Sequence, residues 1–254
     1  MTQTRPWQAA PDIVATQRRS RTALLIAQVA GSVGIGAGAS MGSIIAYEVT
    51  GTESLAGISR TVSALSAGIA APLMVALAIR RGRRAALSWG WTGALVGSLL
   101  QVVAVASLNL PLLLLGLLVF GSGQAATMQS RFAATDLELP ERRARSLSLV
   151  VWAGAVGSVI GPNLAGPGAA VGTALGLSPI SGAYLIGAVG LAAAASAVAI
   201  GLRPDPLQLA QRHEELTEPG ARRRVRDVFP YVGAHPVTRY AFVGLAVNQT
   251  VMVT

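Results

Sequence analysis

The chain has 254 residues, of which 52% are hydrophobic and only 12% are charged. Soluble domains average about 25% charged residues, so this composition excludes an ordinary soluble globular protein. The net charge is +9 and all 20 basic residues are arginines, a balance that nucleic-acid-binding proteins also show. The absence of cysteine excludes disulfides and thiolate chemistry.

The chain alternates long apolar stretches with short polar connections. A polar tail, residues 1–21, comes first and lacks the apolar core of a cleavable signal peptide. Six stretches long enough to cross a ~30 Å hydrocarbon core as helices follow within residues 22–202. They run over about 22–46, 55–79, 85–107, 111–129, 146–170 and 179–202.

A change of composition follows the sixth stretch. Residues 203–239 are charged and contain several prolines, which predicts a linker rather than a span. Within this linker, Asp205 and Pro206 predict the start of a short interfacial helix that runs to Leu216. A seventh apolar segment begins near residue 240 and contains about 15 residues up to 254, fewer than a full span requires.

The arginines occupy only one side of this six-span arrangement. The tail, the connections 80–84 and 131–145 and the segment from residue 203 onward hold 19 of the 20 arginines. The other connections, 47–54, 108–110 and 171–178, hold none. The positive-inside rule therefore predicts a cytoplasmic N-terminus. Because the arginines form a belt along one membrane face, the expected partner is a lipid bilayer and not a nucleic acid.

The fifth stretch, residues 146–170, combines closely spaced glycines with interior prolines. Gly154, Gly157 and Gly161 lie on roughly one helix face and would let a neighbouring helix come close. Pro162 and Pro167 each remove a backbone hydrogen bond, which predicts a kinked helix. The pattern alone leaves two interpretations open, a kink at a moving interface and ordinary small-residue packing.

Part of this stretch carries a resemblance to a known family. Residues 157–166, GSVIGPNLAG, resemble the G-x-x-x-G-P-x-x-G-G signature found in antiporters of the major facilitator superfamily. Four residues match it: Gly157, Gly161, Pro162 and Gly166. Ala165 replaces a glycine. The resemblance implies an all-α polytopic membrane protein with two six-helix halves around a cavity, of which this chain would supply the amino-terminal half and the start of a seventh helix.

The connection after the second stretch resembles another motif of this family, G-x-x-x-D-R-x-G-R-R. Four residues match its basic half: Arg80, Gly82, Arg83 and Arg84. Ile79 replaces the aspartate, and Val75 replaces the first glycine. In the family these groups form a latch on the cytoplasmic face, so the resemblance implies a latch that lacks its acid. The alternative is that the arginines only anchor the protein in the membrane.

Polar residues inside the apolar stretches are the candidates for lining a substrate cavity. They are Gln28, Arg60, Gln101, Gln124 and Asn163. Each neutral one is also suited to a helix–helix hydrogen bond, and Arg60 is close enough to a membrane surface to extend to it. The chain shows no nucleophile–base pair, nucleotide-binding fingerprint or metal-ligand spacing. We therefore expect no catalytic residue, no bound metal and no enzyme activity.

The resemblance implies export of small amphiphilic molecules through the plasma membrane, by alternating access and proton antiport. No cofactor is expected other than a proton gradient. The expected partners are a small-molecule substrate, the bilayer, and either a missing C-terminal half or a second copy in a homodimer. Two alternatives remain open: a truncated product that transports nothing alone, and a small-residue-rich membrane scaffold or channel subunit.

Overall fold

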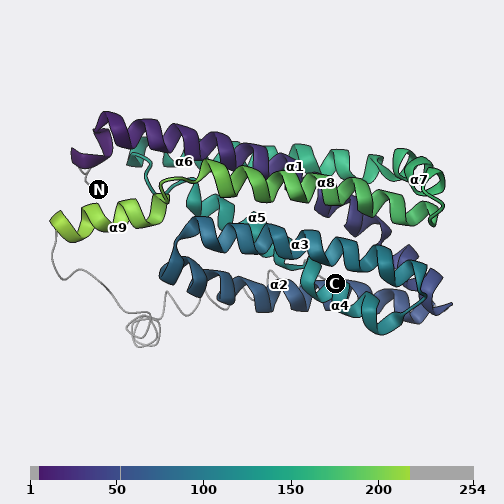
Figure 1. Cartoon of the computed structure of the whole chain (residues 1–254). Helices are drawn as coiled ribbons and strands as arrows, with labels where there is room; N and C mark the ends of the chain where they lie inside the picture. Colours follow the sequence, from purple (N-terminus) through teal and green to yellow (C-terminus); the bar gives the residue numbers. More distant parts are fainter. Residues whose placement is uncertain (1–5, 52, 218–254) are drawn as a thin grey trace. The chain divides into compact units, whose positions relative to one another are not determined.

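The computed structural model describes residues 6–51 and 53–217. A short 3-10 helix, Pro6–Ala9, precedes nine α-helices in these ranges. They are α1 (Pro11–Thr50), α2 (Glu53–Arg81), α3 (Arg83–Ala106), α4 (Leu110–Phe120), α5 (Ser122–Ala133), α6 (Pro140–Asn163), α7 (Ala165–Ala174), α8 (Pro179–Gly201) and α9 (Pro206–Thr217) (Figure 1). The helices from α1 to α8 and the start of α9 belong to one compact unit, Met1–Gln211. The predicted seventh segment, 240–254, lies outside the described residues.

Six helical stretches in the described ranges are long and apolar enough to cross a membrane, as the sequence predicts. The fourth combines α4 and α5, the fifth contains α6, and the sixth contains α8. The prediction of an all-α polytopic membrane protein is confirmed. The predicted short helix that follows the sixth stretch is also present, as α9.

The first helix is longer than its apolar stretch. It begins at Pro11, inside the predicted tail, because extended Ala10 and a proline in the first turn start a helix well. It ends at Thr50, inside the predicted turn 47–54, where Gly51 adopts the left-handed conformation that terminates helices. Residue 22 is therefore a boundary of hydropathy and not of the helix.

Close contacts between small residues hold α1 in the middle of the bundle. Its most extensive contacts are with α6 on one side and α8 on the other. Gly34 lies against Gly187 and Leu191 of α8, and a side chain at Gly34 would come within 2.6 Å of the Gly187 carbonyl oxygen. Trp91 of α3 is fully buried and fills the space beside Gly31. The glycines of the first helix are thus used for close packing.

The two ends of the bundle differ in charge. One end is formed by residues 11–21, 80–84, 131–145 and 203–205, and we call it the basic end (Figure 1). At the opposite end the last turn of α1 meets the α7–α8 connection, where the Ser178 hydroxyl donates to Glu48 Oε1 over 3.1 Å. α7 extends to Ala174, so the predicted connection 171–178 is partly helical.

Candidate functional site

The turn between α2 and α3 is built around Gly82 at the basic end. Gly82 has φ +90°, a conformation that favours glycine, and its amide donates to the Ala78 carbonyl over 2.8 Å. A β-carbon at this position would also overlap the carboxylate of Asp205. The site therefore requires glycine for two independent reasons, backbone conformation and the close approach of Asp205.

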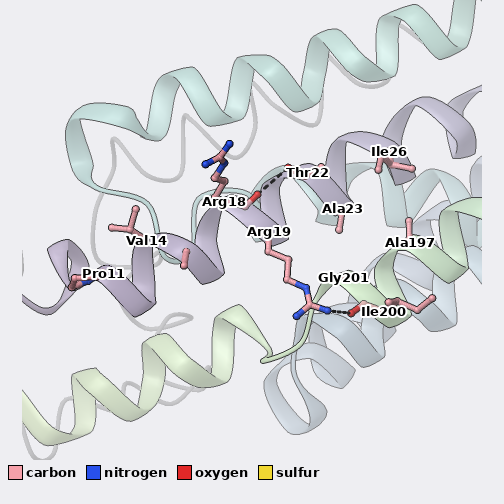
Figure 2. Close-up of a pocket in the computed structure, with 11 residues that line it drawn as sticks. Pro11, Val14, Arg18, Arg19, Thr22, Ala23, Ile26, Ala197, Ile200 and Gly201 are labelled. Carbon is pink, nitrogen blue, oxygen red and sulfur yellow. Dashed lines mark hydrogen bonds between the residues drawn. The ribbon is translucent and has the colours of Figure 1, made fainter.

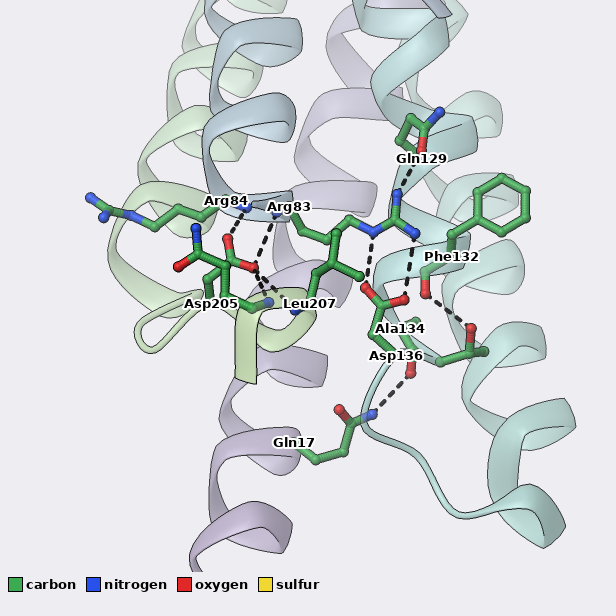
Figure 3. Close-up of polar contacts among 11 residues, drawn as sticks. Gln17, Arg83, Arg84, Gln129, Phe132, Ala134, Asp136, Asp205 and Leu207 are labelled. Carbon is green, nitrogen blue, oxygen red and sulfur yellow. Dashed lines mark hydrogen bonds and ion pairs between the residues drawn. The ribbon is translucent and has the colours of Figure 1, made fainter. Parts of the chain in front are cut away.

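Asp205 caps two helices at once (Figure 3). Its Oδ1 accepts from the Arg83 amide over 3.2 Å, and its Oδ2 accepts from the Arg84 amide over 2.7 Å, at the start of α3. Oδ1 also accepts from the Leu207 and Gln208 amides, over 3.0 and 3.3 Å, at the start of α9. The first amides of a helix have no partner within it, and a carboxylate also suits the positive end of the helix dipole.

The Arg83 side chain extends to the α5–α6 connection. Its Nε donates to Asp136 Oδ2 over 2.9 Å, and its Nη2 donates to Oδ1 over 3.4 Å, a two-point contact (Figure 3). Its Nη1 donates to Gln129 Oε1 over 3.0 Å, and the guanidinium lies 6.0 Å from the centre of the Phe132 ring. Such charge-assisted, two-point bonds are among the stronger ones in proteins.

The Arg83–Asp136 ion pair is largely shielded from solvent, with 15% and 13% of the two side chains exposed. Burial raises the pKa of the Asp136 carboxyl above its ordinary value, and the hydrogen bond and charge of Arg83 only partly offset this. The pair is therefore a shielded tie between α3 and the α5–α6 connection.

The remaining residues of the predicted latch have different environments. Arg84 Nε donates to the Ala199 carbonyl near the end of α8 over 2.8 Å. Arg80 is exposed at the end of α2. Ile79, where the motif has its acid, is 50% exposed. Carboxylates from two other segments, Asp136 and Asp205, approach this connection instead.

A second polar cluster ties α1 to the α5–α6 connection. Glu138 is only 5% exposed and accepts from Gln17 Nε2 over 3.2 Å and from the Ser146 hydroxyl over 2.5 Å. Arg21 Nη1 lies 3.9 Å from the same carboxylate. Gln17 Nε2 also donates to the Ala134 carbonyl over 2.9 Å. These bonds explain why the polar residues before position 22 continue the helix.

The glycine–proline motif of the fifth stretch has a packed face and an open face. A side chain at Gly157 would come within 2.5 Å of the Val29 carbonyl, and one at Gly161 within 2.7 Å of the Val33 carbonyl. Both carbonyls belong to α1, so the predicted close helix partner lies within the same bundle. Gly166 has no atom within 4 Å of such a side chain. Where the sequence predicts a kinked helix, the structure has a break: α6 ends one residue after Pro162, and Pro167 lies in the first turn of α7.

The five cavity-lining candidates are spread over different parts of the bundle. Gln28 is buried on α1 beside Gly154 of α6. Gln101 is buried, donates to the Gly97 carbonyl of its own helix over 3.3 Å and lies against Gly116 of α4. Gln124 is half-buried on α5, and Asn163 is exposed and donates to the Val159 carbonyl over 2.7 Å. The side chain of Arg60 lies outside the described residues. Their role in a cavity stays a prediction.

Sequence reasoning alone did not assign Asp136, Glu138 and the second role of Asp205. A local signal existed only for Asp205, whose position before a proline predicts a helix cap. Its contact with α3 joins residues 121 or more positions apart, and the Arg83–Asp136 contact joins residues 53 positions apart. No pattern within one segment reports such pairs.

Three relatives are about a third identical to this chain over the residues that align with it. The uncharacterized MFS-type transporter YddS of Bacillus subtilis is 32% identical over 184 residues, which cover 72% of this chain and 42% of the relative. The uncharacterized MFS-type transporter YdeG of the same organism is 31% identical over 201 residues, covering 79% and 47%. The riboflavin transporter RfnT of Brucella anthropi is 31% identical over 152 residues, covering 58% and 37%.

The chain thus spans about half the length of the curated relatives it matches. No solved structure matches it. The sequence model of the Major Facilitator Superfamily matches residues 19–254, which is most of the chain and includes all six spans except the first turns of α1. The chain belongs to the major facilitator superfamily of transporters.

Proposed function

We propose that the six spans form one moving half of a transporter that exports small amphiphilic molecules by alternating access, in exchange for protons. The observation that carries the proposal is how firmly the bundle is tied together. α1 packs on α6 and α8 through glycines, and the Asp205 and Arg83 contacts join α3, α5 and the end of α8. Alternating access is largely a rigid-body rocking of one bundle against another, which requires a bundle that moves as a unit.

The open face of the fifth span is where we propose that a second bundle packs. Trp152 is 73% exposed and Val159 is 67% exposed on α6, on the side away from the glycines that contact α1. The interruption at Pro162 lies on this side, because the Pro162 and Asn163 side chains are also exposed. The partner is either the rest of a longer protein, since the relatives are about twice as long, or a second copy of this chain.

We also propose that the basic end faces the cytoplasm and that the membrane is the plasma membrane, following the positive-inside rule. The absence of cysteine makes the orientation easy to test, because any introduced cysteine is the only thiol in the chain. Ala144 is exposed at the basic end, and Ser107 is exposed at the other end. In intact cells an impermeant maleimide is expected to label Ser107→Cys, and to label Ala144→Cys only after permeabilisation. The reverse pattern would refute the orientation.

Transport is tested in liposomes with an imposed pH gradient, with rhodamine 6G as a fluorescent amphiphilic cation. The chain is reconstituted alone and, in parallel, joined to the part of the YddS relative that this chain does not match. Dye movement that requires the protein and disappears when a protonophore collapses the gradient supports proton-coupled export. Movement that persists without the gradient would refute the coupling, and movement equal to that of empty liposomes in both preparations would refute the transport of this dye class.

Riboflavin is the second substrate to test, because one relative is named a riboflavin transporter. Its flat ring system with a polar side chain is amphiphilic but carries no positive charge. Uptake of riboflavin without movement of the cationic dye would replace the proposed substrate class while leaving the carrier mechanism in place.

The role of the helix break in the fifth span is tested in the same transport assay with the variant Pro162→Ala. Pro162→Ala restores a backbone amide and lets the helix continue, while the exposed position limits the cost in packing. The matched control is Pro140→Ala, at the first turn of the same helix, where proline is well tolerated. We expect slower flux only for Pro162→Ala. Equal flux in both variants would contradict a role of the interruption in the moving interface.

A further inference from the structure

An open apolar groove runs between the start of α1 and the end of α8 at the basic end (Figure 2). Its volume is about 840 Å³, in the range of about 300–1,000 Å³ that is typical of ligand sites. Its lining is mostly hydrocarbon and includes Val14, Ala23, Ile26, Ala197, Ile200 and Gly201. The groove is separate from the Arg83 and Glu138 clusters, because none of these lining residues takes part in them.

The groove has a floor of small residues and two edges of exposed apolar side chains. A β-carbon at Gly201 of α8 would overlap the β-carbon of Ala23 on α1. The two helices therefore lie in close contact at the floor of the groove. Ile26 is 53% exposed and Ile200 is 66% exposed on the two edges. Such edges favour an apolar occupant over water.

Two arginines stand where the groove reaches the end of the apolar span. Arg19 Nη2 donates to the Ile200 carbonyl over 3.2 Å, which draws its side chain across to α8 (Figure 2). Arg18 is exposed on the next position of α1, and its side chain points to the other side in the same view. Within the described part of the chain, neither guanidinium is paired with a carboxylate.

The groove therefore has its two cationic residues between apolar ones, with Val14 on one side of them along α1 and Ile26 on the other. Ile26 lies eight residues beyond Arg18 on α1, a rise of about 12 Å along a helix. An occupant that fits must be amphiphilic, with a hydrocarbon part along the helices and an anionic group at the basic end. A second copy of the chain is a poor fit, because it would bring the same arginines toward each other.

We propose that this groove binds one anionic phospholipid, with an acyl chain between α1 and α8 and the phosphate at Arg19, while Arg18 on the neighbouring position adds positive charge nearby. The membrane itself supplies this ligand to the open side of the groove. An anionic lipid is attracted to each nearby arginine, whereas a zwitterionic lipid has no net charge for them to attract. The site does not depend on the proposed transport function, since it lies on the outer surface of the helix pair.

Native mass spectrometry of the full chain in detergent tests the site with two lipids of identical acyl chains, phosphatidylglycerol and phosphatidylcholine. We expect one molecule of phosphatidylglycerol to be retained preferentially. The double variant Arg18→Gln/Arg19→Gln is expected to lower that preference about thirtyfold. The matched control is Arg80→Gln/Arg81→Gln, an exposed adjacent pair at the basic end with the same change in charge. Equal losses in both double variants would show general attraction to the basic end and would overturn the site.

A second pair of variants tests the apolar part of the groove without changing charge. Ala197→Phe fills the groove from α8, and Val189→Phe adds the same ring two turns away on an exposed position of that helix. Retention of phosphatidylglycerol is expected to fall only in Ala197→Phe. If both variants retain it equally, or if Ala197→Phe abolishes a dimer instead, the groove is not a lipid site. If Ala197→Phe does not fold, the comparison of the two arginine double variants alone tests the lipid site.

Discussion

Removal of the Asp205 carboxylate is the most direct test of how the basic end is held together. Asp205→Ala deletes acceptors for four amides, two at the start of α3 and two at the start of α9. Replacing one helix cap by alanine costs about 0.5–2 kcal/mol, typically about 1. With two helices capped, we expect a loss of about 2 kcal/mol in the free energy of unfolding. For a protein of this length, this corresponds to a fall in melting temperature of about 4–8 °C.

The assay is unfolding in mixed detergent micelles, followed by tryptophan fluorescence. Asp12→Ala is the matched control, because Asp12 is exposed in the first turn of α1 and is outside the cluster. A surface change of this kind is expected to shift stability by less than about 0.5 kcal/mol. Asp205→Asn keeps one acceptor oxygen and is expected to fall between the two. If Asp205→Ala is no less stable than Asp12→Ala, the double cap contributes nothing and the reasoning is wrong.

Three further predictions use the same unfolding measurement. Gly161→Leu is expected to lower the free energy of unfolding by about 1–3 kcal/mol, because the new side chain meets α1 backbone that cannot move aside. Gly166→Leu, in open space, is expected to be near neutral. Similar losses of stability in both variants would contradict the close packing at Gly161. Burial raises the pKa of Asp136, so folding favours the protonated form of this carboxyl. The stability that protonated Asp136 contributes is present at low pH and is lost as the pH rises through the raised pKa. We expect the wild type to gain stability relative to Asp136→Asn between about pH 8 and about pH 4, and a relative loss would mean that the charge of Arg83 outweighs burial. Gln101→Leu is expected to be neutral or stabilising, since the buried Oε1 of Gln101 has no partner among the described groups, and a large loss of stability would reveal one.

The sequence predicts the spans because hydropathy is a property of single segments. The predicted sixth span, 179–202, differs from α8, Pro179–Gly201, by one residue. The predicted third span, 85–107, is shifted by at most two residues from α3. The first helix departs most, because its start is stabilised by contacts that hydropathy does not register. Gln17 and Ser20 are polar residues that are nevertheless buried, Gln17 through bonds to the α5–α6 connection.

The glycine pattern of the fifth stretch was informative about packing but not about the partner. Spacing places Gly157 and Gly161 on one face of a helix, and that face is indeed closely packed. Which helix packs there depends on the order of the helices in space, and the structure identifies α1. Position 166 shows the limit of motif matching, since Gly166 fits the signature and yet meets nothing within 4 Å.

The carboxylates at the basic end join segments that are far apart in the chain. An acid at position 79 would belong to the same connection as Gly82, and a bond there would hold only the turn between α2 and α3. Asp205 instead lies beyond the end of α8, and two of its four bonds join that end to the start of α3, while the other two cap α9. Any displacement of residues 203–206 from α3 breaks the two α3 bonds together and exposes two unpaired amides. Because Arg84 binds the Ala199 carbonyl in the same region, the end of the sixth span and the α2–α3 connection are expected to move together or to separate in a single step.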